Sequence, residues 1–172
     1  MTKKRIALIS TGGTIEKTYD QLSGLLTNRL SVLDIMLSSF ELRGIELVRV
    51  PLMNKDSLEM NGTDHTLIAQ TAGSFAQAHD GVVVVHGTDR LANTGERMVE
   101  LLGTPRVPIV LTGAMRPYEL RHTDALQNLT EALLAAQLLA PGVYLAMHAQ
   151  VLAFPGVVKD RALGSFRKLE GT

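Results

Sequence analysis

The chain has 172 residues, of which 45% are hydrophobic and 20% are charged, and this composition is typical of one compact globular domain with a proper core. The 17 basic and 17 acidic side chains cancel, and basic residues gather only at positions 3–5, so we expect no nucleic-acid partner. Cysteine is absent, which excludes a disulfide framework, a thiolate metal site and a cysteine nucleophile.

Apolar runs alternate with helical patterns along the chain, which predicts βα units and a parallel sheet that is buried on both faces. The expected strands are Arg5–Ser10, Ile45–Pro51, Gly81–His86, Pro108–Thr112 and Gly142–Met147. Apolar residues at helical spacing predict helices within residues 31–42, 67–78, 91–102 and 126–134, the first with Ser31 as its N-cap and Gly44 as its stop. The predicted fold is a three-layer α/β fold, flavodoxin-like or Rossmann-like, with an open, mainly parallel sheet and helices on both faces, in a single domain over residues 1–172.

Three further segments complete this prediction. The stretch Thr11–Arg29 is too long for an ordinary connector and is typical of a lid, and we expect Asp160–Thr172 to form a short terminal helix. The N-terminal apolar run Ile6–Ile9 is far shorter than a signal peptide, and no stretch approaches the length of a membrane span. We therefore expect a cytoplasmic protein that does not enter a membrane.

Two of the expected strands end directly in hydroxyl-bearing residues. Gly81–His86 is followed by Gly87, Thr88 and Asp89, and Arg5–Ser10 is followed by the sequence Thr-Gly-Gly-Thr. The ligand crevice of an open parallel sheet lies at the carboxyl ends of its strands, so these two tips predict one shared pocket. The Walker A and dinucleotide-binding spacings are both absent, which argues against a phosphate site.

Each candidate residue also has a purely structural interpretation. Thr11 and Thr14 either cap a turn, or Thr14 presents a nucleophilic hydroxyl. Asp89 is either a helix N-cap or part of a site, and Ser57 is either a cap or a ligand-binding hydroxyl. Lys159 is either a solvated lysine or a base that reaches the crevice. The five histidines show no metal-ligand spacing, so we predict no metal site, and we expect His86 to be a strand-end hydrogen-bonding residue rather than a base.

Three motifs, taken in order, resemble the bacterial-type asparaginase/glutaminase amidohydrolase family. The motifs are Thr11–Ile15 (TGGTI), His86–Asp89 (HGTD) and Thr112–Pro117 (TGAMRP), the last with Asp124 and Asn128 downstream. Together they extend from Ile6 to about Phe166. The resemblance implies the fold of the N-terminal domain of these enzymes.

The resemblance also implies catalytic roles at matching positions. Thr14 would be the primary nucleophile, and Tyr19, on the mobile loop, would orient or activate it. Thr88, Lys159 and Asp89 would form the second catalytic group, in which Lys159 moves protons and Asp89 orients it. These roles follow from the family and not from the spacing of the residues.

Four positions correspond to substrate contacts in the family. Ser57 would hold the α-carboxylate of the substrate and Asp89 its α-amine, while the backbone at Gly13 and Ala114 would approach the reacting amide. Two departures bear on these contacts: Arg90 replaces the usual threonine after the aspartate, and Leu58 replaces a polar residue after the binding serine. Most members carry a C-terminal domain that the 172 residues do not include, so we expect a short single-domain form with weaker substrate binding.

The implied reaction is hydrolysis of L-asparagine to L-aspartate and ammonia through a threonine acyl-enzyme, without a cofactor and with a low glutaminase activity. Two alternatives remain: an amidase related to tRNA-dependent amidotransferases, and a non-catalytic sensor of asparagine or aspartate. The expected partners are the small-molecule substrate and further copies of the chain, in a homodimer or a homotetramer.

Overall fold

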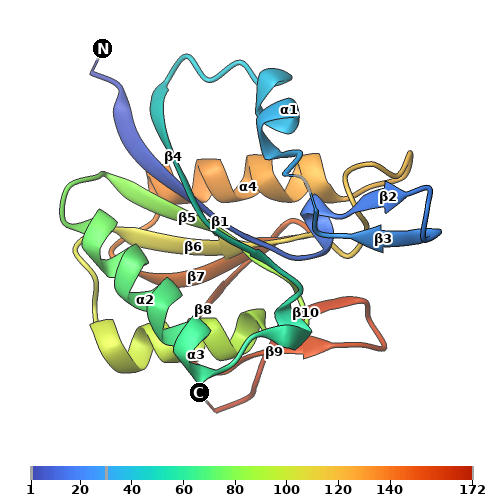
Figure 1. The fold of residues 1–172 in the computed structure, drawn as a ribbon. Coiled ribbons are helices and arrows are strands. Elements are labelled where there is room, and N and C mark those ends of the chain that lie inside the picture. The colour runs from blue at the N-terminus through green and yellow to red at the C-terminus, as the bar shows by residue number, and fades with distance from the viewer. Residues whose placement is uncertain (1, 30, 172) are drawn as a thin grey trace.

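The computed structural model describes residues 2–29 and 31–171, which form a central six-stranded sheet (Figure 1). In spatial order, the strands are β4 (Ile45–Lys55), β1 (Lys4–Gly12), β5 (Gly81–Val85), β6 (Pro108–Thr112), β7 (Gly142–Met147) and β8 (Gln150–Ala153). The first five are parallel and confirm the five predicted strands, whereas β8 returns antiparallel to β7. A two-residue turn at His148 and Ala149, both at positive φ, makes this return possible.

Helices cover both faces of the sheet, as predicted (Figure 1). The helices α2 (Gly62–Ala76) and α3 (Leu91–Leu102) lie on one face, and α1 (Leu33–Ser38) and α4 (Ala125–Leu138) lie on the other. The three-layer α/β prediction is therefore confirmed. Within the described ranges, no helix is long and apolar enough to cross a membrane.

The alternation of side chains along β1 divides the core into two halves. Ala7 and Ile9 pack toward α2 and α3, while Ile6 and Leu8 pack toward α1 and α4. The neighbouring strand β5 is fully buried at every position, because helices cover it on both sides. Burial on both faces explains why its sequence is an unbroken run of valines.

The first predicted helix is shorter than the sequence suggested. Helix α1 ends at Ser38 rather than Leu42, and its N-cap is Val32, not Ser31. The hydroxyls of Ser38 and Ser39 donate to carbonyls within the helix and close it early. Ser31 instead donates to the Glu16 carboxylate, which anchors the segment after β1.

The predicted C-terminal helix is wrong. The segment predicted as this helix, Asp160–Thr172, instead contains the end of strand β9 (Val157–Asp160) and all of strand β10 (Ser165–Lys168), which form an antiparallel hairpin. Thr172 lies outside the described residues. The Asp160 carboxylate accepts the N–H groups of Ala162 and Leu163 within the turn, and Gly164 at φ +60° completes it. A short segment that ends in glycine favours a hairpin here.

The predicted lid is partly ordered into a second hairpin. Strands β2 (Thr18–Asp20) and β3 (Leu25–Thr27) pair within it and project from the molecule, to the right in Figure 1. We call residues 18–27 the flap. A short 3-10 helix, η1 (Thr14–Glu16), connects β1 to it.

The order of the five parallel strands places a ligand crevice between β1 and β5. Numbered along the chain, these strands lie in the order 2-1-3-4-5, which is the flavodoxin-like arrangement. The connections after the first and the third strand leave the sheet toward opposite faces, so a crevice opens outside their carboxyl ends. Those ends carry Thr14 and Thr88.

Candidate active site

The two strand tips are joined by direct backbone contact. We call residues 11–14 the β1 tip and residues 86–89 the β5 tip. A Cβ on Gly13 would overlap the Cα and N atoms of Gly87, and Gly13 has φ +83°, so only glycine allows this approach. The buried Thr11 hydroxyl donates to the Val85 carbonyl at 2.8 Å. Thr11 is therefore structural, and it ties the tips together.

Thr14 presents its hydroxyl without a structural role. It begins η1, where no side chain caps the helix, and within the part of the chain that the structure describes its hydroxyl has no hydrogen-bond partner. The neighbouring Gly13 N–H donates to the Lys55 carbonyl at 2.9 Å, and the Gly13 carbonyl accepts from the Asn28 side chain at 2.8 Å. These bonds fix the turn, while the Thr14 hydroxyl stays available.

Lys159 lies within hydrogen-bonding distance of both Thr88 and Asp89. Lys159 Nζ donates to Thr88 Oγ1 at 2.8 Å and to Asp89 Oδ1 at 2.9 Å. Thr88 is 3% exposed and the Lys159 side chain 18%, so this lysine is not a solvated one. Helix α3 has Arg90 as its N-cap, which leaves the Asp89 carboxylate to Lys159 and, at 3.3 Å, to Arg161.

A chain of buried hydrogen bonds holds the β5 tip in shape. The His86 Nδ1–H donates to the Gly87 carbonyl at 2.8 Å, because a carbonyl only accepts. Nε2 then accepts from the Thr94 hydroxyl at 2.7 Å, and this hydroxyl accepts from His65 Nδ1 at 2.7 Å. Burial lowers the pKa of His86 to about 4, so the ring is neutral. His86 is thus a hydrogen-bonding residue at the strand end.

Ser57 lies against the β5 tip from the neighbouring element. It begins a second 3-10 helix, η2 (Ser57–Glu59), is 1% exposed, and its hydroxyl accepts the Arg90 N–H at 3.3 Å. The cap of η2 is Asp56, whose carboxylate accepts the Leu58 N–H. The Ser57 hydroxyl would lie 2.6 Å from a Cβ on Gly87, so Ser57 is packed directly against the residue that precedes Thr88.

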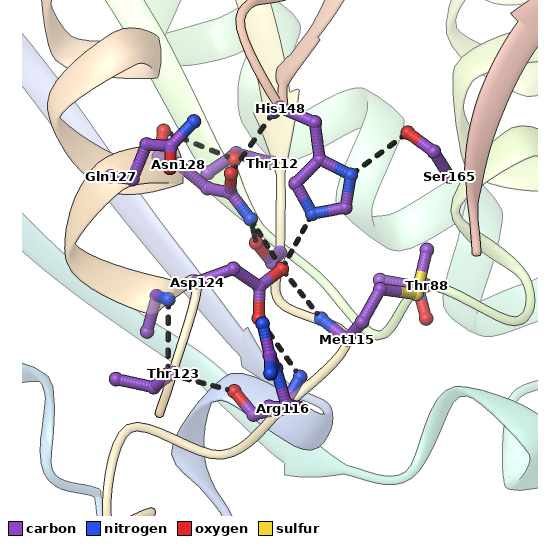
Figure 2. A network of polar contacts seen from close by, with 12 residues as sticks. Thr88, Thr112, Met115, Arg116, Thr123, Asp124, Gln127, Asn128, His148 and Ser165 are labelled. Atoms are coloured by element: carbon purple, nitrogen blue, oxygen red, sulfur yellow. Dashed lines mark hydrogen bonds and ion pairs between the residues drawn. The ribbon is translucent and has the colours of Figure 1, made fainter. Parts of the chain in front are cut away.

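The loop after β6 forms a further wall of the crevice and contains Ala114. A Cβ on Gly113 would overlap the His86 carbonyl and lie 3.3 Å from the Thr88 methyl group, which puts this loop against the β5 tip. Ala114 is fully buried. The Asp124 carboxylate accepts the next two backbone N–H groups, at 3.0 Å each, and fixes the loop (Figure 2).

Tyr19 is the expected site residue that the structure does not bring to the others. It lies on the flap, is 59% exposed, and its backbone N–H donates to the Glu119 carboxylate. No hydrogen bond joins its phenol to Thr14 in the described ranges. Tyr19 would reach Thr14 only through movement of the flap.

Several residues of the site carry no signal in the sequence. Arg161 pairs with Asp89, and His148 with Asp124, across more than 20 positions of chain, and neither pair belongs to a motif. A cavity of about 1100 Å³ lies between α2, α3 and β9 and is lined by none of the expected site residues. The described residues contain no group of three His, Cys, Asp or Glu side chains placed to hold a metal ion.

Comparison with known proteins gives matches over most of the chain. The family described as "Asparaginase, N-terminal" matches residues 5–165. An L-asparaginase from Thermococcus kodakarensis is 30% identical over 162 residues, which are 93% of this chain and 49% of that protein. A glutamyl-tRNA(Gln) amidotransferase component from Haloquadratum walsbyi is 34% identical over 147 residues, which are 84% of this chain and 33% of that protein.

Solved structures give the same picture in three dimensions. The thermostable L-asparaginase from Thermococcus kodakarensis matches with a TM-score of 0.88 and 28% identity, over 98% of this chain and 52% of that one. The probable cytoplasmic L-asparaginase from Campylobacter jejuni matches with a TM-score of 0.80 and 28% identity, over 96% and 52%. The chain therefore spans between a third and about half of the length of these relatives.

Proposed function

Because the chain belongs to the asparaginase family, we propose that it hydrolyses the side-chain amide of L-asparagine to L-aspartate and ammonia. The observation that supports this most directly is the cluster of Thr88, Lys159 and Asp89 beside the unpartnered hydroxyl of Thr14. A hydroxyl nucleophile needs a group nearby that moves protons, and a lysine held by a carboxylate is such a group. Neither the sheet nor its packing requires Lys159 to bond to both Thr88 and Asp89.

The reaction would proceed in two steps. In the first, Thr14 Oγ1 bonds to the amide carbon, the C–N bond breaks, and ammonia leaves with the hydroxyl proton. In the second, water adds to the resulting β-aspartyl ester and frees Thr14. Lys159 would remove and return protons, with Asp89 fixing its orientation.

Backbone N–H groups at the two tips would stabilise the oxyanion. The N–H groups of Thr14 and Thr88 have no backbone partner among the residues described, whereas the Gly13 N–H already bonds to Lys55. Donors that point at a developing oxyanion contribute on the order of 3 kcal/mol each. The Ala114 loop, which lies against Thr88, would close the other side of the reacting amide.

The amino-acid part of the substrate would bind beside the same tips. The Ser57 hydroxyl would hold the α-carboxylate, and the Asp89 carboxylate would hold the α-amine. Asp89 has a 25% exposed side chain and two cationic neighbours, Lys159 and Arg161. Its carboxylate would therefore interact with these two side chains and with the α-amine of the substrate at the same time. We expect weak binding for this reason.

A second candidate function rests on the 34% identity to the amidotransferase component. That protein's name concerns glutamyl-tRNA(Gln), so this chain could act as the amidase part of a larger assembly with glutamine as its amide. The chain has 17 basic and 17 acidic residues, so it lacks the excess of positive charge that favours binding to the phosphates of tRNA. We therefore rank L-asparaginase first, and a non-catalytic sensor of asparagine or aspartate last.

One assay separates these functions. Purified protein is mixed with L-asparagine, L-glutamine and D-asparagine, and ammonia is measured beside the Thr14→Ala and Thr88→Ala variants. We expect release from L-asparagine, a slower release from L-glutamine, and none from either variant. Preference for L-glutamine would favour the amidotransferase function, and binding by calorimetry without ammonia would favour the sensor.

The assembly and setting of the protein are also proposals. We propose a homodimer or a homotetramer, which light scattering at two protein concentrations would detect. A single catalytic domain over residues 1–172 and a cytoplasmic location stay predictions from the sequence.

A further inference from the structure

A side-chain bridge links the loop after β6 to the β9–β10 hairpin (Figure 2). We call Asp124, His148 and Ser165 the His148 bridge. We propose that His148 is a positioning residue, which sets the wall beside Thr88 and the hairpin that carries Lys159 in fixed relation to each other. This inference rests on the proposed function for its catalytic consequence, but the bridge itself is a feature of the fold.

The chemistry of the side chains fixes the direction of the hydrogen bond between His148 and Asp124. Burial raises the pKa of Asp124, but bonds from the Met115 N–H, His148 and the Arg116 N–H outweigh it and hold that pKa below its usual value. The ionised carboxylate only accepts, so His148 Nε2–H donates to it at 2.7 Å. Nδ1 contacts the Ser165 hydroxyl at 2.8 Å, and a hydroxyl can either donate or accept in this bond.

One end of the bridge reaches the wall beside Thr88. Asp124 holds the backbone N–H groups of Met115 and Arg116, and Asn128 donates to the Gly113 carbonyl at 2.9 Å and to Asp124 at 2.9 Å. Because a Cβ on Gly113 would lie only 3.3 Å from the Thr88 methyl group, the loop passes close to Thr88, and any shift of Asp124 would move the surroundings of Thr88. Asn128 is fully buried, so this end is rigid.

The other end reaches the strand pair that delivers Lys159. Ser165 begins β10 and lies opposite Asp160 in β9, one residue from Lys159, while Phe166 lies opposite Lys159 and is buried. Lys159 in turn donates to Thr88. The bridge therefore closes a ring that runs from Thr88 through Asp124, His148 and Ser165 to Lys159 and back.

The backbone at His148 is built to hold this ring in place. His148 and Ala149 have φ values of 55° and 58°, a region that few non-glycine residues adopt and that Asn and His tolerate better than most. The His148 N–H donates to Asn128 Oδ1 at 3.1 Å, and the Ala149 N–H donates to the Glu131 carboxylate at 3.0 Å. The imidazole is thus aimed between Asp124 and Ser165 by bonds on its own backbone.

Three variants and a control test the proposal. His148→Asn keeps a residue that tolerates the left-handed backbone, but its side chain is too short to span both partners. Ser165→Ala removes the hairpin end alone, and His148→Gln offers a longer amide that can donate and accept. Leu163→Ala, at a 70% exposed position on the same hairpin, is the matched control.

We expect His148→Asn and Ser165→Ala each to lower kcat for L-asparagine about tenfold, with KM within about twofold of the wild type, because a misplacement of catalytic groups falls on the chemical step. The double variant, with His148→Asn and Ser165→Ala together, should lose no more kcat than either single variant, since both substitutions break the same ring. His148→Gln should recover part of kcat, and Leu163→Ala should match the wild type. Unchanged kcat in both single variants, additive losses, or an equal loss in Leu163→Ala would overturn the proposal.

Amide hydrogen exchange tests whether the bridge couples the two segments, and it does not require enzymatic activity. Ser165→Ala lies on the hairpin, yet we expect it to speed exchange of the Met115 and Arg116 amides about tenfold, while Leu163→Ala leaves them unchanged. If the wild type releases no ammonia from any amide, the proposed function fails, and the exchange rates still test the bridge. Identical exchange in the wild type and Ser165→Ala would show that the bridge does not couple the two segments.

Discussion

The two strand tips of the crevice differ in how completely the fold has assembled them. At the β5 tip, Thr88 is almost fully buried and its hydroxyl already accepts from Lys159. At the β1 tip, Thr14 is partly exposed and its hydroxyl has no partner among the described residues. One half of the crevice is thus preorganised by the sheet, whereas the other half is left free for a ligand.

The surroundings of the tips explain this difference. The β5 tip is enclosed by Ser57, the Ala114 loop and the buried hydrogen bonds of His86. The β1 tip continues into the flap, where Leu22 and Leu25 are 89% and 62% exposed. Few buried contacts support the flap, so we expect a low barrier to its local movement.

The largest effect is expected where the tips touch. Gly13→Ala adds a Cβ that overlaps Gly87 and places alanine at φ +83°, so we expect a loss of about 3 kcal/mol or more in the free energy of unfolding, from backbone strain and overpacking together. Gly24→Ala is the matched control: Gly24 has φ +70° but no atom within 4 Å of its Cβ position, so it should cost only about 1–2 kcal/mol of strain. Urea unfolding measures both, and equal losses would show that the tips are not in close contact.

The next effect concerns the pH dependence of the β5 tip. The folded pKa of His86 is about 4, below its unfolded value of 6.5, so its contribution to stability is complete above pH 6.5 and is lost as the pH falls toward 4. Between pH 7 and pH 5 the wild type should lose about 2 kcal/mol of unfolding free energy from this residue. His86→Gln, which does not titrate, should show a flatter profile in the same range. Parallel profiles would mean that folding does not lower the pKa of His86.

The fold of the molecule was predictable from sequence to a large extent, because its signals are local. Unbroken apolar runs give β1, β5, β6 and β7, and a mainly apolar run that contains Glu46 and Arg49 gives β4. These strands define the switch point where the crevice opens. The length of helix α1 was overestimated because serine hydroxyls bond to its last carbonyl groups and compete with the helix backbone. The spacing of apolar residues carries no information about this competition. The β9–β10 hairpin was missed because a single glycine turn, in a segment without strong alternation, decided its form.

The site was less predictable, since it depends on contacts between distant residues. The sequence predicts hydroxyls at two strand tips, but on spacing alone Lys159 was an exposed lysine. Only the hairpin geometry places its Nζ at 2.8 Å from Thr88. His148 was merely one of five histidines, because its partners Asp124 and Ser165 are 24 and 17 positions away. The placement of Tyr19 followed from the family resemblance and depends on a flap that can move.

A smaller effect should distinguish the two threonines. Thr88→Val removes an acceptor from a part-buried lysine, and we expect a loss of about 1.5–3 kcal/mol in unfolding free energy, the range for hydrogen bonds to charged groups. Thr14→Val removes a hydroxyl without a partner and should change stability by less than about 0.5 kcal/mol. Thermal unfolding of both variants measures the contrast. Equal losses would contradict the view that only the β5 tip is preassembled.

The smallest effect is expected at the flap. Tyr19→Phe removes an exposed phenol hydroxyl, so the unfolding free energy should change by less than about 0.5 kcal/mol. The control Tyr144→Phe, whose hydroxyl donates to the Ala140 carbonyl at 3.1 Å far from the crevice, should cost about 0.5–1.5 kcal/mol and leave ammonia release unchanged. If the flap closes on the substrate and brings the phenol to Thr14, Tyr19→Phe lowers kcat despite its neutral stability, by about a hundredfold where the phenol moves a proton. A wild-type kcat in Tyr19→Phe would instead mean that Thr14 is activated without the flap, and that the open half of the crevice is completed by the substrate alone.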